Sequence, residues 1–285
     1  MTLTPLIRMT LALVAAPLAL SSQARSQSPV QQSDTTPYTT VFYRNGPLNL
    51  EAYLYKPNGT GPFPVVIYNH GSRAGAERNE RPFTFIGRLL TSAGYAVLVP
   101  ERRGYGKSDG RTFGEEIGMD RGDRYVDRLR EEGNDVLAAL PFLQTVSWVD
   151  MSRVGIMGWS FGGIVSVFAA SKEARFFAVV DQAGGALTWP ASPALRSALP
   201  AAARKIRSPL LCMGAENDAT TENVKQVCGA AKAAGVGAEL IIYPAFTPSR
   251  IPPNVAPGHM IFSAEGVGHW DKDVLEFLGA HASKK

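Results

Sequence analysis

Cysteine is almost absent from this chain of 285 residues, which contains only Cys212 and Cys228. Neither belongs to a Cys-x-x-Cys pair or a His-rich pattern, so the sequence does not predict a structural zinc site, and we expect no metal. Export would allow the two cysteines to form a disulfide. The segments around them equally suit two buried thiols, so both alternatives stay open.

Hydrophobic runs long enough to span a membrane are also missing. The apolar stretch at residues 9–20 falls short of the roughly 20 residues that a membrane helix needs. Arg8 is the only charged side chain before the end of this stretch, and the small residues Ser22-Gln23-Ala24 follow. This pattern predicts a signal peptide over residues 1–24 and an exported protein, periplasmic or secreted, with no membrane insertion after signal removal.

A dominant charge of one sign is missing as well. The 29 Lys and Arg residues are interspersed with 25 Asp and Glu residues, for a net charge of +4. Scattered charge of this kind does not indicate a nucleic-acid partner. Residues 25–37 are polar and lack apolar periodicity, so we expect a flexible arm there, followed by one domain over residues 38–285. Nothing in the sequence indicates an oligomeric state.

From residue 38 onward, short β-rich runs alternate with longer helical patterns. This order is typical of an α/β fold in which helices cover both faces of a mostly parallel sheet. Asn45-Gly46 is a typical hairpin turn between the first two runs. The segment 183–208 is short and rich in Ala and Pro, so we expect no large cap domain. The expected strands, about eight in all, cover residues 40–44, 48–55, 63–69, 95–100, 154–157, 176–180, 209–213 and 239–243.

The longest helical pattern runs from about residue 120 to 143, and its first half mixes acidic and basic side chains. Alternating charges at helical spacing are typical of a solvated face with ion pairs, which is the expectation here. The alternative is a charged rim beside a functional site. Other helices are expected near 86–94, 162–171, 222–234 and 271–280.

Ser160 is the strongest candidate for chemistry, since it stands in Gly158-Trp159-Ser160-Phe161-Gly162 between a predicted strand and a predicted helix. A tight strand-to-helix turn exposes such a serine, and the helix start supplies free N–H groups and the positive end of a dipole. We predict that Ser160 is a nucleophile. The alternative is a Gly-Ser turn that only packs the helix.

A serine hydroxyl needs a base to take its proton, and the base needs a carboxylate to hold it. Asp218 follows a predicted strand, and His259 lies in the loop before the last helix, which matches the chain order Ser, Asp, His. We predict these two as acid and base. Glu216 and Asp181 are weaker candidates for the acid, and His269 is the second candidate for the base.

Attack on a carbonyl creates an oxyanion, which backbone N–H groups stabilise. Phe161, directly after the nucleophile, is predicted to supply one N–H group, and Ser72 in Asn69-His70-Gly71-Ser72 the other. His70, Arg103 and Trp159 are candidates for substrate binding, with Arg103 suited to a substrate carboxylate. The alternatives are that His70 only ends a strand and that Arg103 lies in a structural turn. The loop at 246–258 contains four prolines and is expected to form a stiff pocket rim.

Five segments carry a resemblance to a known family, namely NHGS at 69–72, ERRGYGKSDG at 101–110, GWSFGG at 158–163, LLCMGAEND at 210–218 and GHMIF at 258–262. They resemble the α/β-hydrolase superfamily, and within it the dienelactone hydrolase and prolyl-oligopeptidase-like branch. The resemblance implies the α/β-hydrolase fold, hydrolysis without a cofactor, Asp218 as acid and His259 as base. Two features depart from the family pattern, Trp159 where relatives often have histidine and the long Pro-rich loop before His259.

These observations favour an exported serine hydrolase that cleaves a small-molecule carboxylic ester through an acyl-enzyme. A small exported peptidase or amidase is the first alternative, because the same triad cleaves amides when the leaving amine is protonated. A non-catalytic binding protein on the same fold is the second.

Overall fold

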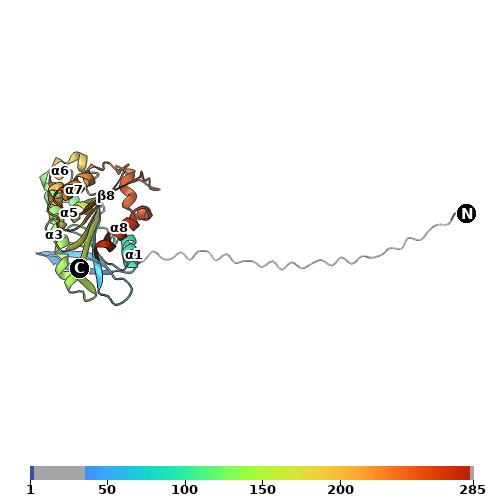
Figure 1. Ribbon diagram of the computed structural model, residues 1–285, viewed down its shortest axis with the longest axis horizontal. Helices are drawn as coiled ribbons and strands as arrows, with labels where there is room; N and C mark the ends of the chain where they lie inside the picture. Colours follow the sequence, from blue (N-terminus) through green and yellow to red (C-terminus); the bar gives the residue numbers. More distant parts are fainter. Residues whose placement is uncertain (3–35, 283–285) are drawn as a thin grey trace. The chain divides into compact units, whose positions relative to one another are not determined.

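Eight strands form one sheet in the order β1-β2-β4-β3-β5-β6-β7-β8 (Figure 1). The structure is a computed structural model that describes residues 1–2 and 36–282, so the predicted signal peptide beyond its first two residues and most of the predicted arm lie outside the described residues. The strands are β1 Thr39–Asn45, β2 Leu48–Tyr55, β3 Phe63–Asn69, β4 Ala96–Pro100, β5 Val149–Trp159, β6 Phe176–Gln182, β7 Leu210–Ala215 and β8 Ala238–Tyr243.

The sheet is antiparallel at one end and parallel elsewhere. The β1–β2 and β2–β4 pairs are antiparallel, and all pairs from β4 through β3 to β8 are parallel. The predicted mostly parallel sheet of about eight strands is therefore confirmed, and so is the hairpin at Asn45-Gly46. The described residues 36–282 form one compact unit.

Helices cover both faces of the sheet, and the strand sequences explain why. In β3, Val65 and Ile67 belong to one buried cluster, whereas Val66 and Tyr68 belong to another on the opposite face. Successive strand residues point to opposite faces, so a strand buried on both sides becomes a continuous apolar run. The first cluster packs on α3 Asp123–Leu137, α5 Phe161–Ala170, α6 Pro193–Ala203 and α7 Glu222–Ala233, and the second on α1 Thr84–Ser92 and α8 Val267–Ala282 (Figure 1).

Several element boundaries differ from the sequence-based expectation. The helical pattern at 120–143 is two helices, α3 and α4 Ala139–Gln144. Helix α8 begins at Val267, so His269 lies inside it. Helix α6 was not predicted, because its Ala- and Pro-rich sequence includes Pro200 within the helix. Short helices complete the described chain at α2 Phe113–Glu116, η1 Trp189–Ala191, η2 Pro257–Phe262 and η3 Ala264–Gly266.

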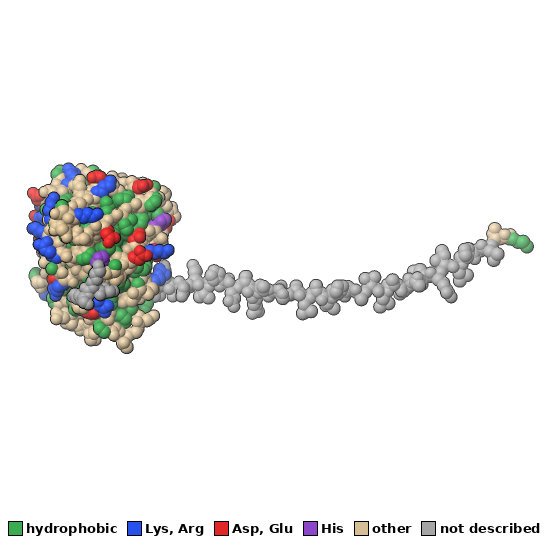
Figure 2. Space-filling model, viewed as in Figure 1, with side chains coloured by type: hydrophobic (Ala, Val, Ile, Leu, Met, Phe, Trp, Pro, Cys, Tyr) green, Lys and Arg blue, Asp and Glu red, His purple; other side chains and the backbone are tan. Residues whose placement is uncertain are grey.

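Cys212 and Cys228 are both free and buried, so the structure contains two buried thiols and no disulfide between them. Figure 2 shows Lys and Arg side chains interspersed with Asp and Glu on the visible face. No helix among the described residues is long and apolar enough to cross a membrane.

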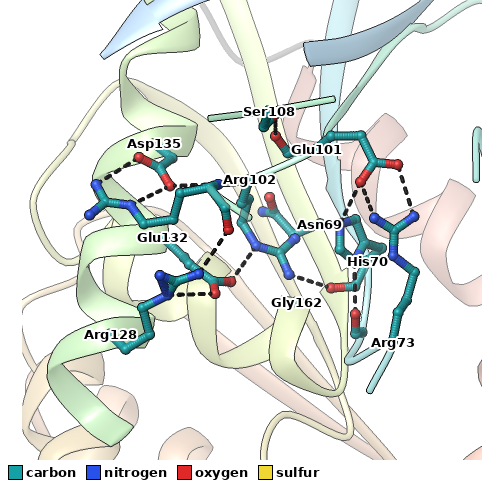
Figure 3. Close-up of polar contacts among 12 residues, drawn as sticks. Asn69, His70, Arg73, Glu101, Arg102, Ser108, Arg128, Glu132, Asp135 and Gly162 are labelled. Atoms are coloured by element: carbon teal, nitrogen blue, oxygen red, sulfur yellow. Dashed lines mark hydrogen bonds and ion pairs between the residues drawn. The ribbon is translucent and has the colours of Figure 1, made fainter. Parts of the chain in front are cut away.

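The expectation of a solvated charged face in the first half of the helical pattern at 120–143 is wrong for Arg128 and Glu132. Both are almost fully buried, and so is Asp135 further along α3. They recur at helical spacing on the same stripe as Tyr125 and Leu129, so the helix turns them toward the sheet rather than toward water. Their charges are paired there: Glu132 accepts hydrogen bonds from the Nε atoms of Arg102 and Arg128, at 2.6 and 3.3 Å (Figure 3).

Removal of the Glu132 carboxylate tests how much this buried network contributes to stability. In Glu132→Ala, the guanidinium of Arg102 stays buried without its carboxylate partner, so we expect a loss of about 3–5 kcal/mol in the free energy of unfolding. The neighbouring Glu131→Ala is the matched control, since that half-exposed carboxylate only pairs with Arg103 and is worth at most about 1 kcal/mol. Urea denaturation of both variants measures the difference, and equal losses would contradict this account.

Candidate active site

Ser160 occupies a strained turn between β5 and α5. Its φ of +58° is a conformation that residues with a side chain rarely adopt. The turn is tight because a Cβ atom on Gly162 would overlap the carbonyl oxygen of Asn69 at the end of β3. The hydroxyl is thereby held at the carboxyl edge of the sheet, directly before the first N–H groups of α5.

His259 and Asp218 come together from two separate loops. The Nδ1 atom of His259 lies 2.9 Å from Oδ2 of Asp218, and both side chains are buried. A carboxylate accepts, so Nδ1 of the imidazole donates and Nε2 is left with its lone pair. The other oxygen of Asp218 accepts the N–H of Ala219 at 2.6 Å.

Hydrogen bonds to the backbone hold the two loops in place. The carbonyl of His259 accepts the indole N–H of Trp159 at 3.1 Å, which ties the base loop to the residue before Ser160. The side chain of Asn217 forms two bonds with the backbone of Phe246, and Gly258 donates to the carbonyl of Asn217. The loop that carries the histidine is therefore clamped at both ends beside the acid.

Ser160 and His259 line the same cavity, whose volume is about 750 Å³. One wall comes from the loop at 71–83, and the other from the Pro-rich loop, including Pro252 and Pro253. Gly71 and Ser72 also line the cavity, and a Cβ atom on Gly71 would lie 3.3 Å from Cβ of Ser160. The backbone of the predicted oxyanion loop thus passes directly beside the candidate nucleophile.

The structure does not bring two of the predicted substrate-binding residues to the cavity. His70 is fully buried behind it, with Nδ1 2.7 Å from the carbonyl oxygen of Gly71. Arg103 donates from Nε and Nη2 to Asp135, both at 2.9 Å, so its guanidinium is already bound to a carboxylate. Trp159, the third candidate, does line the cavity.

The weaker candidates for acid and base lie elsewhere. Glu216 and His269 are exposed, and the His269 ring packs against Phe246. Asp181 is fully buried; its Oδ1 accepts the N–H of Gly184 at 2.8 Å, while its Oδ2 has no hydrogen-bond partner among the described residues. Burial raises the pKa of Asp181 to about 7. Among the described residues, no group of three or more His, Cys, Asp or Glu side chains is arranged to hold a metal ion.

Sequence reasoning missed the wall at 73–83. Arg73, Asn79 and Arg81 line the cavity, although this segment has no motif or periodicity. The signal that would have found it is its position, because a long irregular segment directly after a parallel strand lies at the carboxyl edge, where functional residues gather.

Known proteins resemble this chain in sequence and in fold. The model of the dienelactone hydrolase family matches residues 50–256. Among curated proteins, the chain is similar to the quorum-quenching protein AidA of Acinetobacter baumannii, with 29% identity over 142 residues, which are 50% of this chain and 42% of that protein. The chain spans about half or less of the length of the curated relatives that it matches.

Two solved structures share the fold. An acylaminoacyl peptidase from Pyrococcus horikoshii has a TM-score of 0.64 at 19% identity, and the match covers 87% of this chain and 42% of that one. An esterase from Pyrococcus furiosus has a TM-score of 0.64 at 18% identity, with 88% and 95% covered. These likenesses confirm the expected α/β-hydrolase fold.

Asp181 generates a prediction about stability and pH. With a pKa raised from 3.8 to about 7, the folded state keeps a proton that the unfolded state loses, so stability falls as pH rises through this window. Asp181→Asn removes the titration. Between pH 4 and 8, the free energy of unfolding of the variant should therefore rise relative to the parent by on the order of 4 kcal/mol.

Urea denaturation at a series of pH values measures this difference. The control is Asp127→Asn, an exposed aspartate paired with Arg130, which should follow the parent at every pH. A pH dependence of Asp181→Asn that is identical to that of the parent would show that the buried carboxyl does not titrate in this window.

Proposed function

The chain belongs to the dienelactone hydrolase family, and on that premise we propose that it is an exported serine hydrolase that cleaves carboxylic esters of small molecules. The observation that carries the proposal is the buried His259–Asp218 pair, which opens onto the same cavity as the strained Ser160. A dienelactone is itself a cyclic ester, so the family name supports the ester as the bond that is cleaved.

The proposed reaction proceeds through an acyl-enzyme. The Ser160 hydroxyl attacks the carbonyl carbon while Nε2 of His259 takes its proton, and the imidazolium then gives this proton to the leaving alcohol. Asp218 holds the imidazole through Nδ1 and stabilises its charged form. Water attacks the acyl group in the second half, with His259 again as the base, and releases the acid and free Ser160.

The oxyanion that forms in each half is assigned to two backbone donors. The N–H group of Phe161 belongs to the first turn of α5, where it has no acceptor within the helix. The second donor is the N–H group of Ser72, on the opposite wall beside Ser160. Each such donor stabilises the transition state by roughly 3 kcal/mol.

The two walls of the cavity differ in polarity, which favours a substrate with one apolar and one polar end. Pro252, Pro253 and Met260 give one wall an apolar surface, whereas the charged side chains of Glu80 and Arg81 lie in the other. Burial of an acyl chain against the Pro-rich wall would contribute binding free energy in proportion to its area. Small or medium acyl groups fit a cavity of about 750 Å³.

The Ser160→Ala variant tests the proposal directly. We expect the parent to hydrolyse short p-nitrophenyl esters and to be labelled by a fluorophosphonate probe at Ser160. The variant should lose at least about 10³-fold in kcat, because the acyl-enzyme cannot form. Ser171→Ala, at the far end of α5, is the matched control and should keep full activity.

A parallel panel of p-nitroanilides separates ester hydrolysis from the peptidase or amidase alternative, which predicts faster cleavage of the amides. A parent protein that neither cleaves any member of the panel nor reacts with the probe would be the non-catalytic binding protein instead.

Export has its own test. The apolar stretch after Arg8 and the small residues at 22–24 support signal cleavage after Ala24. Expression of the full chain in a bacterium should yield a protein whose N-terminal sequence begins at Arg25 and which appears outside the cytoplasm. The control lacks residues 1–24 and should stay in the cytoplasm. Recovery of the intact chain from the cytoplasm would refute export.

A further inference from the structure

A cluster of buried charged side chains lies directly behind the loop that carries Ser72. Strands β3 and β4 are parallel neighbours, with Ile67 opposite Leu98, so the chain leaves both strands at the same edge. His70 follows β3, and Glu101 and Arg102 follow β4; all three are fully buried (Figure 3). The proposed reaction gives none of them a part.

Two of these side chains hold consecutive peptide groups of the loop. Nη2 of Arg102 donates to the carbonyl oxygen of His70 at 2.9 Å, and Nδ1 of His70 lies 2.7 Å from the carbonyl oxygen of Gly71. A carbonyl oxygen only accepts, so the proton of the His70 ring is on Nδ1. The His70–Gly71 and Gly71–Ser72 peptides are thus each fixed by a donor from a buried side chain.

The ring of His70 is itself held in one orientation and one charge state. It stacks on Phe83, with the two ring planes 3° apart, and meets Tyr105 edge-on. Burial and the nearby charge of Arg102 lower its pKa to about 3, so the ring is neutral. Glu101, near its other nitrogen, is bound by the guanidinium of Arg73.

Arg102 is anchored from the opposite side. Its Nε atom donates to Glu132 on α3, and Arg128 on the same helix donates to the second oxygen of that carboxylate. The Arg102 guanidinium, which donates to the His70 carbonyl, is therefore held in place by a side chain of α3.

The geometry of the Gly71–Ser72 peptide relates the position of the His70 ring to the direction of the Ser72 N–H group. The C=O and N–H groups of a trans peptide point in opposite directions, and the only cis peptide among the described residues is Gly61–Pro62. When the Gly71 carbonyl points to the buried ring, the N–H group of Ser72 must point away from it. Ser72 lines the cavity together with Ser160, so a Ser72 N–H group that points away from the ring is placed to face the proposed oxyanion.

We propose that His70 is a positioning residue, whose Nδ1–H group orients the Gly71–Ser72 peptide so that the Ser72 amide donates to the oxyanion, with Arg102 fixing the preceding peptide. This inference rests on the proposed hydrolase function. It replaces the role of His70 in substrate binding by a role in transition-state stabilisation that acts through the backbone.

Two substitutions of His70 separate the donor from the ring. His70→Phe keeps a stacked ring but has no N–H group, whereas His70→Asn loses the ring but places its side-chain NH₂ near the position of Nδ1. For His70→Phe we expect kcat/KM on p-nitrophenyl butyrate to fall about 10- to 100-fold, less than the 10²–10³-fold expected for outright loss of a donor. For His70→Asn we expect a value within about fivefold of the parent, because the charge-neutral donor is restored.

A second measurement distinguishes positioning from general damage. An alkyl trifluoromethyl ketone forms an oxyanion adduct with serine, so its affinity should fall by the same factor as kcat/KM in His70→Phe, while KM changes little. Melting temperatures of both variants identify loss of the fold. Equal activity of folded His70→Phe and parent would overturn the proposal, as would a folded His70→Asn that is as impaired as His70→Phe.

The protonation state of the His70 ring in the parent protein offers a third test, which does not depend on enzymatic activity. In ¹⁵N NMR of histidine-labelled protein, one imidazole should stay neutral with its proton on Nδ1 from about pH 5 to 9, and its signal should vanish in His70→Asn. A proton on Nε2, or a charged ring, would overturn the inference. A parent without hydrolase activity or probe labelling would instead overturn the proposed function, so the two failures are distinguishable.

Discussion

The close approach of α5 to the end of β3 is the constraint on which the whole site depends. Gly162 lies so near the carbonyl oxygen of Asn69 that no side chain fits between them. Asn69 reinforces the contact, because its amide donates to Ser166, and Ser166 donates to the carbonyl of Gly162. The turn with Ser160, the proposed nucleophile, and the loop with the proposed oxyanion donor are thereby held at a fixed separation.

The buried charges behind this contact serve orientation more than stability. Ion pairs removed from water gain little net free energy, because desolvation offsets most of the attraction. The Glu132–Arg102 and Glu101–Arg73 pairs nevertheless place rigid hydrogen-bond donors and rings behind one short loop. A hydrophobic replacement of similar volume would pack as well, but it would leave the carbonyl of His70 without a donor.

The sequence predicted the features that depend on local pattern. The strand runs, the turn at Ser160 and the chain order of Asp218 and His259 can all be read from the sequence, and the structure places these two predicted residues in contact. It missed features that depend on which way a helix faces: Arg128 and Glu132 are polar by type but lie on the buried stripe of α3. The sequence also did not show that His70 and Arg103 lie away from the cavity, because the carboxylates beside them, Glu101 and Asp135, are distant in sequence.

The loop before His259 is fixed at both ends, and this affects how sites of this kind can vary between proteins. Phe246 is fastened to Asn217 at one end, and His259 is fastened to Trp159 at the other. The dozen or so residues between them form the apolar wall but carry neither the acid nor the base. Under the proposed function, insertions and deletions in this stretch would therefore change which substrates bind, while the contact between Asp218 and His259 stays unchanged.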